Sequence, residues 1–505
     1  MIQSPNHYQR YGWMRITLLG LLIALVASLL NYVLTCPKCV KDDIDLPKIQ
    51  NLLSSSNYPT ELPNFRKKYM KHLGNATYLD YTGAGVYNDL NLELFRRDIL
   101  YNNTYGINES DPNSKFSINI YDNYKKKIIS ETRETLLNFL GTSSKDNKYT
   151  VIFVPSATQA LKLIGENYKW TKNSKYIYTR YNHNSVLGIR KYALAEGATF
   201  SVVNESTEFE ADPDALYALP LEENFAGMKI SKKEMHRLTH TLGMNVIADT
   251  SAYLPTNRLN LTETPFSALV LSFYKIIGFP NYGACILRND FIDKHFQKKS
   301  YMSNDADVSF LDSTIHRLKY REGSDYSSEF EDDEPNYEMC YAALIGLKSL
   351  MSIGLDNIED HVHKLSQKLY QNLHQMKHSN DAPAIEIYGN HGNTNSLELQ
   401  GGIVSFNIKK SNGDYIGYSQ VVKDATKQNI HLRGGCHCNP GACFSSMKIP
   451  EDIAMDYFNK KTTCGDNNDI IDGIPLGAVR ASLGWATVED DINIFTKFIL
   501  DNYVF

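Results

Sequence analysis

Cysteine is scarce in this sequence, and neither sign of charge is in large excess. Eight cysteines in 505 residues are too few for a disulfide scaffold. Lysine and arginine total 52 against 57 acidic residues, and the mostly tyrosine aromatics are not interleaved with basic residues. This composition gives no indication of a nucleic-acid partner. Repeats and low-complexity tracts are also lacking, so we expect a conventional folded protein of about two to four domains.

One long apolar run is present, and it lies at the amino terminus. Residues 16–35 carry no charge between Arg15 and Lys38, and roughly 20 residues suffice to cross a bilayer. A cleaved signal peptide is the alternative, but the run is long for one and no clear cleavage site follows it. We therefore expect an N-terminal tail at 1–15, a single transmembrane helix at 16–36 and a polar linker at 37–60. Basic residues flank the run on both sides, so the charge rule leaves the topology open.

Strand-like and helix-like segments alternate after the linker. Helices are expected at Tyr121–Leu140 and Gln159–Tyr168, and strands at Tyr149–Val154, Lys175–Thr179, Ala198–Val203, Met244–Ala248, Ala268–Leu271 and Gly283–Leu287. Short apolar strands separated by helices predict an α/β fold, with a largely parallel sheet covered on both faces. The pattern changes after Met351 to a long helix, Asp360–Met376, then strands and a final helix, Glu489–Leu500. We expect a large domain at 61–350 and a smaller α+β domain at 351–505.

Polar residues follow several of these strands, and ligands of parallel sheets bind at strand ends. After the first strand, a helix opens with Ser156, Ala157 and Thr158, whose free amides and hydroxyls could hold a phosphate. After the next strand, His183 offers an imidazole that could stack on an aromatic ligand and exchange protons. A simple helix cap and a structural histidine are the competing interpretations.

Two further strand ends carry a carboxylate and an amine. Asp249 could pair with a protonated ring nitrogen, although a carboxylate there can also cap a turn. Lys275 follows a strand in an apolar setting, where desolvation lowers the pKa of an amine and favours Schiff-base formation. A solvated lysine is the alternative. Taken in order, these strand-end residues resemble the layout of fold-type I pyridoxal-phosphate (PLP) enzymes. Among these enzymes the sequence most resembles the class V aminotransferase branch, which includes the cysteine desulfurases.

The carboxyl-terminal segments narrow the resemblance. The sequence resembles the molybdenum cofactor sulfurase family from about Asn75 to Ile499, most specifically at Leu432–Cys443, Cys464–Gly473 and Gly477–Gly484, and also at Tyr78–Gly85, Ser272–Pro280 and Phe330–Asp332. The resemblance implies PLP as cofactor, L-cysteine as substrate and a homodimer. It implies that Lys275 binds the cofactor covalently, Asp249 its ring nitrogen, His183 its ring face, Asn224 its ring oxygen and Thr158 and Ser272 its phosphate. Arg480 and Arg433 would meet the substrate, because a guanidinium suits a carboxylate.

Cys438 matches the persulfide-carrying cysteine of related desulfurases. Its thiolate, favoured by nearby Arg433 and His437, would take the sulfur of L-cysteine and release alanine. Cys436 ranks second for this role. A structural zinc site built from Cys436, Cys438, Cys443 and Cys464 is the alternative, but the spacing is unlike that of a standard zinc knuckle.

Several departures from the family leave the detailed activity open. Full-length eukaryotic members carry a further carboxyl-terminal domain that binds the molybdenum cofactor, whereas this chain stops at Phe505, so the sulfur acceptor is either that cofactor or a separate protein that binds it. Asp333 and Glu334 replace a Gly-Thr pair, which could weaken PLP binding or the dimer through repulsion of the phosphate. A transmembrane helix is unusual for the family, and we expect the catalytic domain on the cytosolic side. The functional alternative is a membrane-anchored interaction protein with weakened catalysis.

Overall fold

The computed structural model describes residues 45–101, 120–298, 306–311, 316–320, 326–460 and 468–505. The expected tail and transmembrane helix, 1–36, lie outside the described residues, as does 37–44 of the expected linker. Within the described ranges no single helix is long and apolar enough to cross a bilayer. One pair, Tyr337–Ile353 and Leu355–His374, reaches the required length and hydropathy only when both helices are taken together across a 73° bend. The chain divides into a unit ending at Lys48 and a larger unit, Ile49–Phe505, that contains both main sheets.

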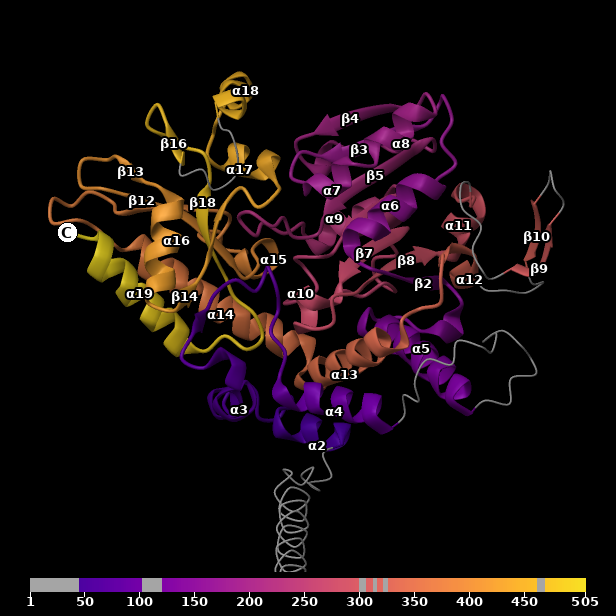
Figure 1. The fold of residues 1–505 in the computed structure, drawn as a ribbon. Coiled ribbons are helices and arrows are strands. Elements are labelled where there is room, and N and C mark those ends of the chain that lie inside the picture. Colours follow the sequence, from indigo (N-terminus) through magenta and orange to yellow (C-terminus); the bar gives the residue numbers. More distant parts are fainter. Residues whose placement is uncertain (1–44, 102–119, 299–305, 312–315, 321–325, 461–467) are drawn as a thin grey trace, which may run out of the picture. The chain divides into compact units, whose positions relative to one another are not determined.

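A seven-stranded sheet forms the centre of the part of the fold that precedes Gly354 (Figure 1). Its spatial order is β2-β8-β7-β6-β5-β3-β4, with bounds Tyr149–Val154 (β2), Lys175–Thr179 (β3), Thr199–Val203 (β4), Ala215–Pro220 (β5), Val246–Asp249 (β6), Ala268–Ser272 (β7) and Gly283–Arg288 (β8). Strand β8 is antiparallel to both β7 and β2, and the other neighbours are parallel. The predicted α/β fold is confirmed, and the sheet is mixed rather than wholly parallel.

Helices cover this sheet, and its central strands are buried. Strands β5, β6 and β7 are buried almost throughout, as expected where both faces are covered. The helices of this half are α4 (Asp89–Tyr101), α5 (Ile120–Phe139), α6 (Ala157–Asn167), α7 (Asn184–Leu187), α8 (Arg190–Ala195), α9 (Lys232–His236), α10 (Phe273–Ile277), α11 (Asn289–His295), α12 (Tyr326–Phe330) and α13 (Tyr337–Ile353). Helices α5 and α12 pack on β2, α6 on β7 and β8, and α8 on β3 and β4. Strands β9 (Ala306–Leu311) and β10 (His316–Tyr320) form a separate antiparallel pair.

A smaller antiparallel sheet lies in the carboxyl-terminal half (Figure 1). Its order is β11-β12-β18-β15, with β13 paired to β12, and its bounds are Ile385–Tyr388 (β11), Ile403–Lys409 (β12), Tyr415–Ile416 (β13), Arg433–Gly435 (β15) and Ala478–Ser482 (β18). The helices here are α14 (Leu355–His374), α15 (Ser396–Leu399), α16 (Tyr418–Lys427), α17 (Pro440–Ser446), α18 (Glu451–Lys460) and α19 (Glu489–Tyr503), and a minor pair joins β16 (Ile470–Ile471) to β17 (Ile474–Pro475). The long helix α14 packs on β11, β12 and α19 with one buried face. The domain boundary expected near residue 350 stays a prediction, and the nearest break is Gly354, between α13 and α14.

The segment before the large sheet joins the carboxyl-terminal half. After α2 (Leu46–Leu52) and α3 (Leu62–Tyr69), strand β1 (Thr77–Tyr78) pairs in parallel with β14 (Ile430–His431). The described part of the expected linker contains α2 and the buried Tyr58, whose hydroxyl donates to the carbonyl of Trp485 at 2.8 Å. Residues 77–86 are thereby placed beside the strand that carries Arg480, because Asp80 forms a parallel bridge with Ser482.

Candidate active site

One cavity of about 110 Å³ lies at the carboxyl ends of five strands of the large sheet. Strands β2, β3, β5, β6 and β7 run in the same direction, so the residues that follow them meet at one edge. The cavity is lined by Ser156, Ala157, Thr158, His183, Ser185, Pro220, Glu222, Asn224, Asp249, Ser251, Ala252, Ser272, Tyr274 and Lys275. The structure therefore brings together every cofactor-binding residue proposed from the sequence.

Lys275 is held in a setting that favours its neutral amine. It lies in α10, directly after β7, and burial lowers its pKa, with only partial compensation from the carboxylate of Asp249. The backbone approaches closely here: a Cβ on Gly85 would stand 2.7 Å from the carbonyl oxygen of Lys275. Gly278 ends the helix at a φ of 78°. A neutral, buried amine is the form that can attack an aldehyde.

Asp249 and His183 flank this amine. One carboxylate oxygen of Asp249 accepts from the amide of Ser251 at 3.0 Å. Nδ1 of His183 accepts from the amide of Ser185 at 3.2 Å and is 2.7 Å from its hydroxyl. Burial lowers the pKa of His183, and the carboxylate of Asp249 opposes this shift only in part. The neutral ring therefore carries its proton on Nε2 and can lie against an aromatic group at neutral pH.

The amino terminus of α6 offers an anion site. Ser156 caps the helix by accepting from the amide of Gln159 at 3.3 Å, and the amide of Ala157 donates to Ser272 Oγ at 3.0 Å. Ser156, Ala157 and Thr158 line the cavity, so the positive end of the helix dipole and two hydroxyls adjoin it. Amides and hydroxyls at a helix start are the donors that a phosphate group requires.

Arg480 and Arg433 lie outside the residues that line this cavity, although both act electrostatically on Lys275. They share the carboxylate of Asp80: Arg480 Nη2 donates to Oδ1 at 3.0 Å, and Arg433 Nη2 donates to Oδ2 at 2.7 Å. Arg480 Nη1 also donates to the carbonyl of Asn224, at 2.8 Å. Asp80 is not among the site residues predicted from the sequence, although it lies within the Tyr78–Gly85 segment.

Cys438 lies at the edge of this arrangement. Its side chain is exposed, and neither it nor Cys436 lines the cavity. Its carbonyl accepts from the amide of Asn184, next to His183, at 2.8 Å, and the carbonyl of His437 accepts from Asn224 Nδ2, also at 2.8 Å. His437 and Cys438 both have positive φ, 55° and 57°, so this turn depends on those hydrogen bonds. The thiol-bearing loop is thus bonded to Asn224, which lines the cavity, and to Asn184, which follows the lining residue His183.

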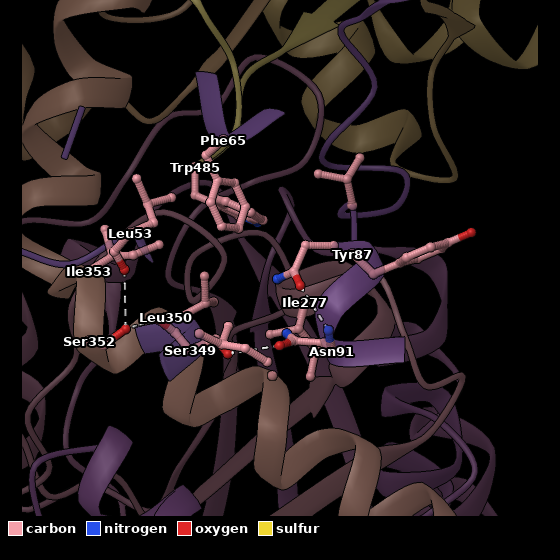
Figure 2. Close-up of a pocket in the computed structure, with 14 residues that line it drawn as sticks. Leu53, Phe65, Tyr87, Asn91, Ile277, Ser349, Leu350, Ser352, Ile353 and Trp485 are labelled. Carbon is pink, nitrogen blue, oxygen red and sulfur yellow. Dashed lines mark hydrogen bonds between the residues drawn. The ribbon is translucent and has the colours of Figure 1, made fainter. Parts of the chain in front are cut away.

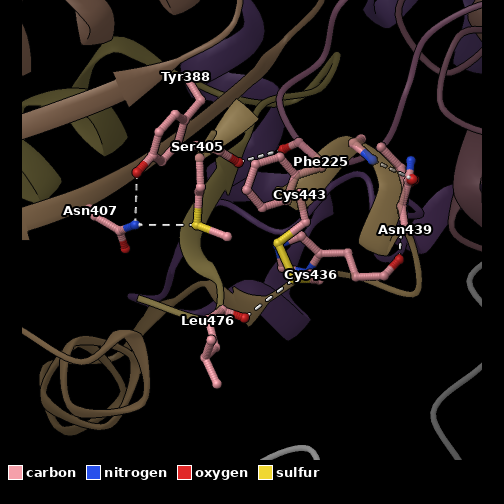
Figure 3. The surroundings of a disulfide bond; sticks show 12 residues. Phe225, Tyr388, Ser405, Asn407, Cys436, Asn439, Cys443 and Leu476 are labelled. Carbon is pink, nitrogen blue, oxygen red and sulfur yellow. Dashed lines mark hydrogen bonds between the residues drawn. A yellow bond between two sulfur atoms is a disulfide. The ribbon is translucent and has the colours of Figure 1, made fainter. Parts of the chain in front are cut away.

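A disulfide joins Cys436 to Cys443 and encloses Cys438 in a short loop (Figure 3). The bond packs against Phe225 and the buried Ala442 and Ala478. Cys436, the second-ranked persulfide candidate, is therefore not a free thiol here. The zinc alternative loses two of its four ligands to this bond, and Cys464 lies outside the described residues. No cluster of three or more metal-binding side chains occurs in the described ranges.

A second cavity beneath α13 is too small for a cofactor (Figure 2). Its volume is about 20 Å³, enough for roughly one water molecule. Leu350, Ile353, Ile277, Phe65 and Trp485 lie around it. The cavity at the strand ends, which carries the donor groups described above, is the better candidate for a cofactor.

Asp333 and Glu334 do not line the cavity at the strand ends in the single chain. Both are exposed. The preceding Glu331 is buried and accepts from the guanidinium of Arg133 at 2.8 Å and from the amide of Phe153 at 2.7 Å. An effect of Asp333 or Glu334 on a partner subunit's cofactor stays a prediction.

The donor set of the cavity at the strand ends fits PLP. A buried amine, a carboxylate, a neutral imidazole and a helix start with hydroxyls correspond to the aldehyde, ring nitrogen, ring face and phosphate of that cofactor. Glu222, which also lines the cavity, could not be predicted from the sequence, since nothing in the pattern marks a carboxylate after β5 as buried. Burial raises the pKa of Glu222 to about 8.

The chain is similar in sequence to named sulfurases. It is 31% identical over 472 residues to the molybdenum cofactor sulfurase of Homo sapiens, which covers 88% of this chain and 51% of that protein. It is 30% identical to the molybdenum cofactor sulfurase of Arabidopsis thaliana, over 88% of this chain and 58% of that protein. The chain thus spans about half the length of the curated relatives it matches.

Solved structures show the same fold. The apo cysteine desulfurase of Thermococcus onnurineus NA1 aligns with a TM-score of 0.67 at 17% identity, over 87% of this chain and 97% of that one. A cysteine desulfurase of Escherichia coli aligns with a TM-score of 0.66 at 13% identity, over 88% and 99%. The family model described as "Aminotransferase class-V" matches residues 104–495. The chain therefore belongs to the class V aminotransferase family, whose members use PLP.

Proposed function

We propose that this chain is a cysteine desulfurase that transfers the sulfur of L-cysteine to the thiol of Cys438 and releases alanine. The main supporting observation is one cavity in which the buried amine of Lys275 faces the charge of Asp249 and the imidazole of His183. The tie between Cys438 and Asn184 places a thiol-bearing loop at its edge. The names of the related sulfurases and desulfurases point to the same chemistry.

The residues of the cavity have separate roles under this proposal. Lys275 would hold the cofactor covalently, and its amine would move a proton at the substrate Cα. Asp249 keeps the ring nitrogen protonated, and His183 lies against the ring. Ser156, Ala157, Thr158 and Ser272 bind the phosphate, while Asn224 meets the ring oxygen. When bound, PLP supplies an electron sink that allows the Cβ–S bond of the substrate to break.

The transfer of sulfur from L-cysteine to Cys438 needs no external oxidant. The thiolate of Cys438 attacks the substrate sulfur, an S–S bond forms, and the Cβ–S bond breaks. The electron pair of that bond remains with the substrate carbon, which takes up a proton and leaves as alanine. The sulfur atom stays on Cys438 as a persulfide, and the exposure of this side chain allows an acceptor to reach it.

The acceptor proposed here is the molybdenum cofactor, or a protein that carries it. The proposal rests on the names of the relatives, which are longer than this chain. Incubation of the persulfide-loaded chain with desulfo molybdenum cofactor should transfer sulfur to it. Transfer to unrelated small thiols alone would contradict this choice of acceptor.

We further propose a membrane anchor at residues 16–36, a catalytic part that faces the cytosol, and a homodimer. The apolar run supports the anchor. Carbonate extraction of membranes should leave the full chain in the pellet, whereas a chain lacking residues 1–44 should be released. Glycan occupancy at Asn102 or Asn260 in cells would contradict a cytosolic orientation, and a monomer in light scattering would contradict the dimer.

The experiment that tests the activity is direct. The purified chain, loaded with PLP, should show visible cofactor absorbance and should release alanine when L-cysteine is added. L-serine, which has the same shape without the sulfur, is the control substrate and should release none. A chain that binds PLP but forms no alanine would fit the interaction-protein alternative instead.

A further inference from the structure

The residue that follows Cys438 in the chain, Asn439, is fully buried. It lies beside the Cys436–Cys443 disulfide and is the N-cap of α17 (Figure 3). As the cap, its Oδ1 accepts from the amide of Ala442 at 3.1 Å. Capping requires only this oxygen. The amide nitrogen of the same side chain is therefore available for a second role.

The side-chain nitrogen of Asn439 donates to two acceptors, and both belong to segments that form the cavity at the strand ends. Nδ2 is 2.7 Å from the carbonyl oxygen of Tyr181 and 3.0 Å from Oδ1 of Asn224. Tyr181 lies between β3 and the lining residue His183, and Asn224 lines the cavity itself. An amide nitrogen carries two hydrogens, so these two bonds use its whole donor capacity.

These contacts determine which way the amide group of Asn224 faces. Its Oδ1 accepts from Asn439, and its Nδ2 donates to the carbonyl of His437 at 2.8 Å. The reverse orientation would place two donors together at Asn439 and two acceptors together at His437, which would leave buried polar groups unsatisfied. Asn224 thus keeps one N–H hydrogen that no described residue accepts, and an N–H is the group that suits the ring oxygen of PLP.

The same side chain also holds the loop that carries the thiol. Cys438 has a φ of 57°, which costs energy for a residue other than glycine. The Cys436–Cys443 disulfide joins two points within this loop, so it does not itself fix the loop to the segment after β3. The bond from Asn439 to Tyr181 does so, in addition to the backbone bond from Asn184. Asn439 therefore connects the thiol-bearing loop to the cofactor-binding side of the cavity.

We infer that Asn439 is a positioning residue for sulfur transfer: its amide nitrogen orients Asn224 toward the cofactor and holds the loop of Cys438 against the cavity. The inference rests on the proposed function and adds to it a residue that does not line the cavity itself. Removal of this nitrogen should affect the cofactor and the loop together. A side chain that only caps α17 would affect neither, provided that the cap oxygen is kept.

Asn439→Ser tests the inference, because serine keeps a cap oxygen and lacks the amide nitrogen. Asn439→Asp is the second variant, because aspartate has the same shape and keeps the cap but donates no hydrogen bond when ionised. The full chain, freed of cofactor, is titrated with PLP, and amide hydrogen exchange is measured in residues 436–443. Asn372→Ser is the matched control, since the amide of Asn372 donates to Thr496 Oγ1 at 3.1 Å and does not line the cavity.

Asn439→Ser should bind PLP about fivefold more weakly and raise exchange in residues 436–443 at least about fivefold, since each lost hydrogen bond changes an equilibrium by about that factor. Because the effect on PLP runs through Asn224, a second experiment introduces Asn439→Ser into Asn224→Ala. There the substitution should cause no further loss of PLP affinity. Asn372→Ser should leave both measurements unchanged.

Unchanged PLP affinity in a folded Asn439 variant, or an equal loss of affinity with and without the side chain of Asn224, would overturn the inference. Unchanged amide exchange in residues 436–443 would overturn it as well. Failure of the proposed function is distinguishable, because the unsubstituted chain would then release no alanine from L-cysteine, while PLP affinity and amide exchange would still report on Asn439.

Discussion

The carbonyl of Cys438 accepts a hydrogen bond from the backbone amide of Asn184 at 2.8 Å. This bond joins the loop that carries the exposed thiol to the residue that follows His183 in the cofactor cavity. The two segments lie far apart in the chain, one after β3 and one after β15. The hydrogen bond therefore connects the loop that bears the proposed persulfide cysteine to the segment that bears His183.

If hydrogen bonds hold this loop in place, their removal should increase its amide hydrogen exchange. Asn224→Ala removes the donor to the carbonyl of His437 and the acceptor for Asn439. We expect amide hydrogen exchange in residues 436–443 to rise at least about fivefold, because each hydrogen bond of this kind contributes about 1 kcal/mol. Mass spectrometry of the exchanged peptides measures this. Asn412→Ala, at an exposed position, should leave the exchange of that peptide unchanged. Unchanged exchange in Asn224→Ala would show that the disulfide alone holds the loop.

The amine of Lys275 is expected to be indispensable for covalent attachment of the cofactor. Lys275→Ala should lose alanine production to below one thousandth of the unsubstituted rate, because no other described amine lines the cavity. Lys191→Ala, at an exposed position in α8, is the matched control and should retain full activity. Reduction with borohydride followed by peptide mapping should place the cofactor on Lys275. A label on another lysine would contradict the assignment.

The buried carboxyl of Glu222 predicts a pH dependence of stability. Burial raises its pKa to about 8 in the folded chain, against about 4.3 when unfolded. Between these values the folded state holds a proton that the unfolded state has released, so stability falls as pH rises. Glu222→Gln removes this loss of stability. The free energy of unfolding should rise by at most about 5 kcal/mol at pH 8 and change little near pH 5.

Urea denaturation at both pH values measures the difference between Glu222→Gln and the unsubstituted chain. Glu196→Gln, an exposed position, should show no such dependence. A larger gain at the lower pH would show that Glu222 is ionised in the folded chain.

Asp80 is expected to be needed for stability because it neutralises Arg480. Asp80→Asn leaves a guanidinium that is 2% exposed without its counter-charge, which should cost about 3 kcal/mol in the free energy of unfolding. Denaturant midpoints measure this, with Asp89→Asn as control, because the Asp89 side chain is 36% exposed against 13% for Asp80. An unchanged midpoint would mean that solvent already compensates Arg480.

Much of the large sheet could be predicted from local pattern. The bounds of β2 and β3 match those expected from their apolar runs, and β6, β7 and β8 differ by at most two residues at each end. Strand β5, Ala215–Pro220, was missed because its small alanines and its terminal proline give a weak strand signal. The antiparallel direction of β8 was also missed, since an apolar run does not encode the direction of its neighbours.

The cavity residues could be predicted because each follows its own strand, whereas the contacts between distant segments could not. Asp80 meets Arg480 across 400 residues and Arg433 across 353, and no local pattern reports such a pairing. The Cys436–Cys443 disulfide depends on a turn in which His437 and Cys438 both adopt positive φ. The family resemblance and the cysteine spacing therefore left a persulfide and a zinc site as the alternatives considered for these cysteines.

The most direct test of the account is to locate the transferred sulfur. The PLP-loaded chain is incubated with L-cysteine, persulfides are trapped by alkylation, and peptides covering residues 433–447 are analysed by mass spectrometry. The account predicts a mass gain of one sulfur atom on Cys438, and its complete loss in Cys438→Ala and in Lys275→Ala. A persulfide on Cys436 or Cys443, or one that persists in Lys275→Ala, would contradict it.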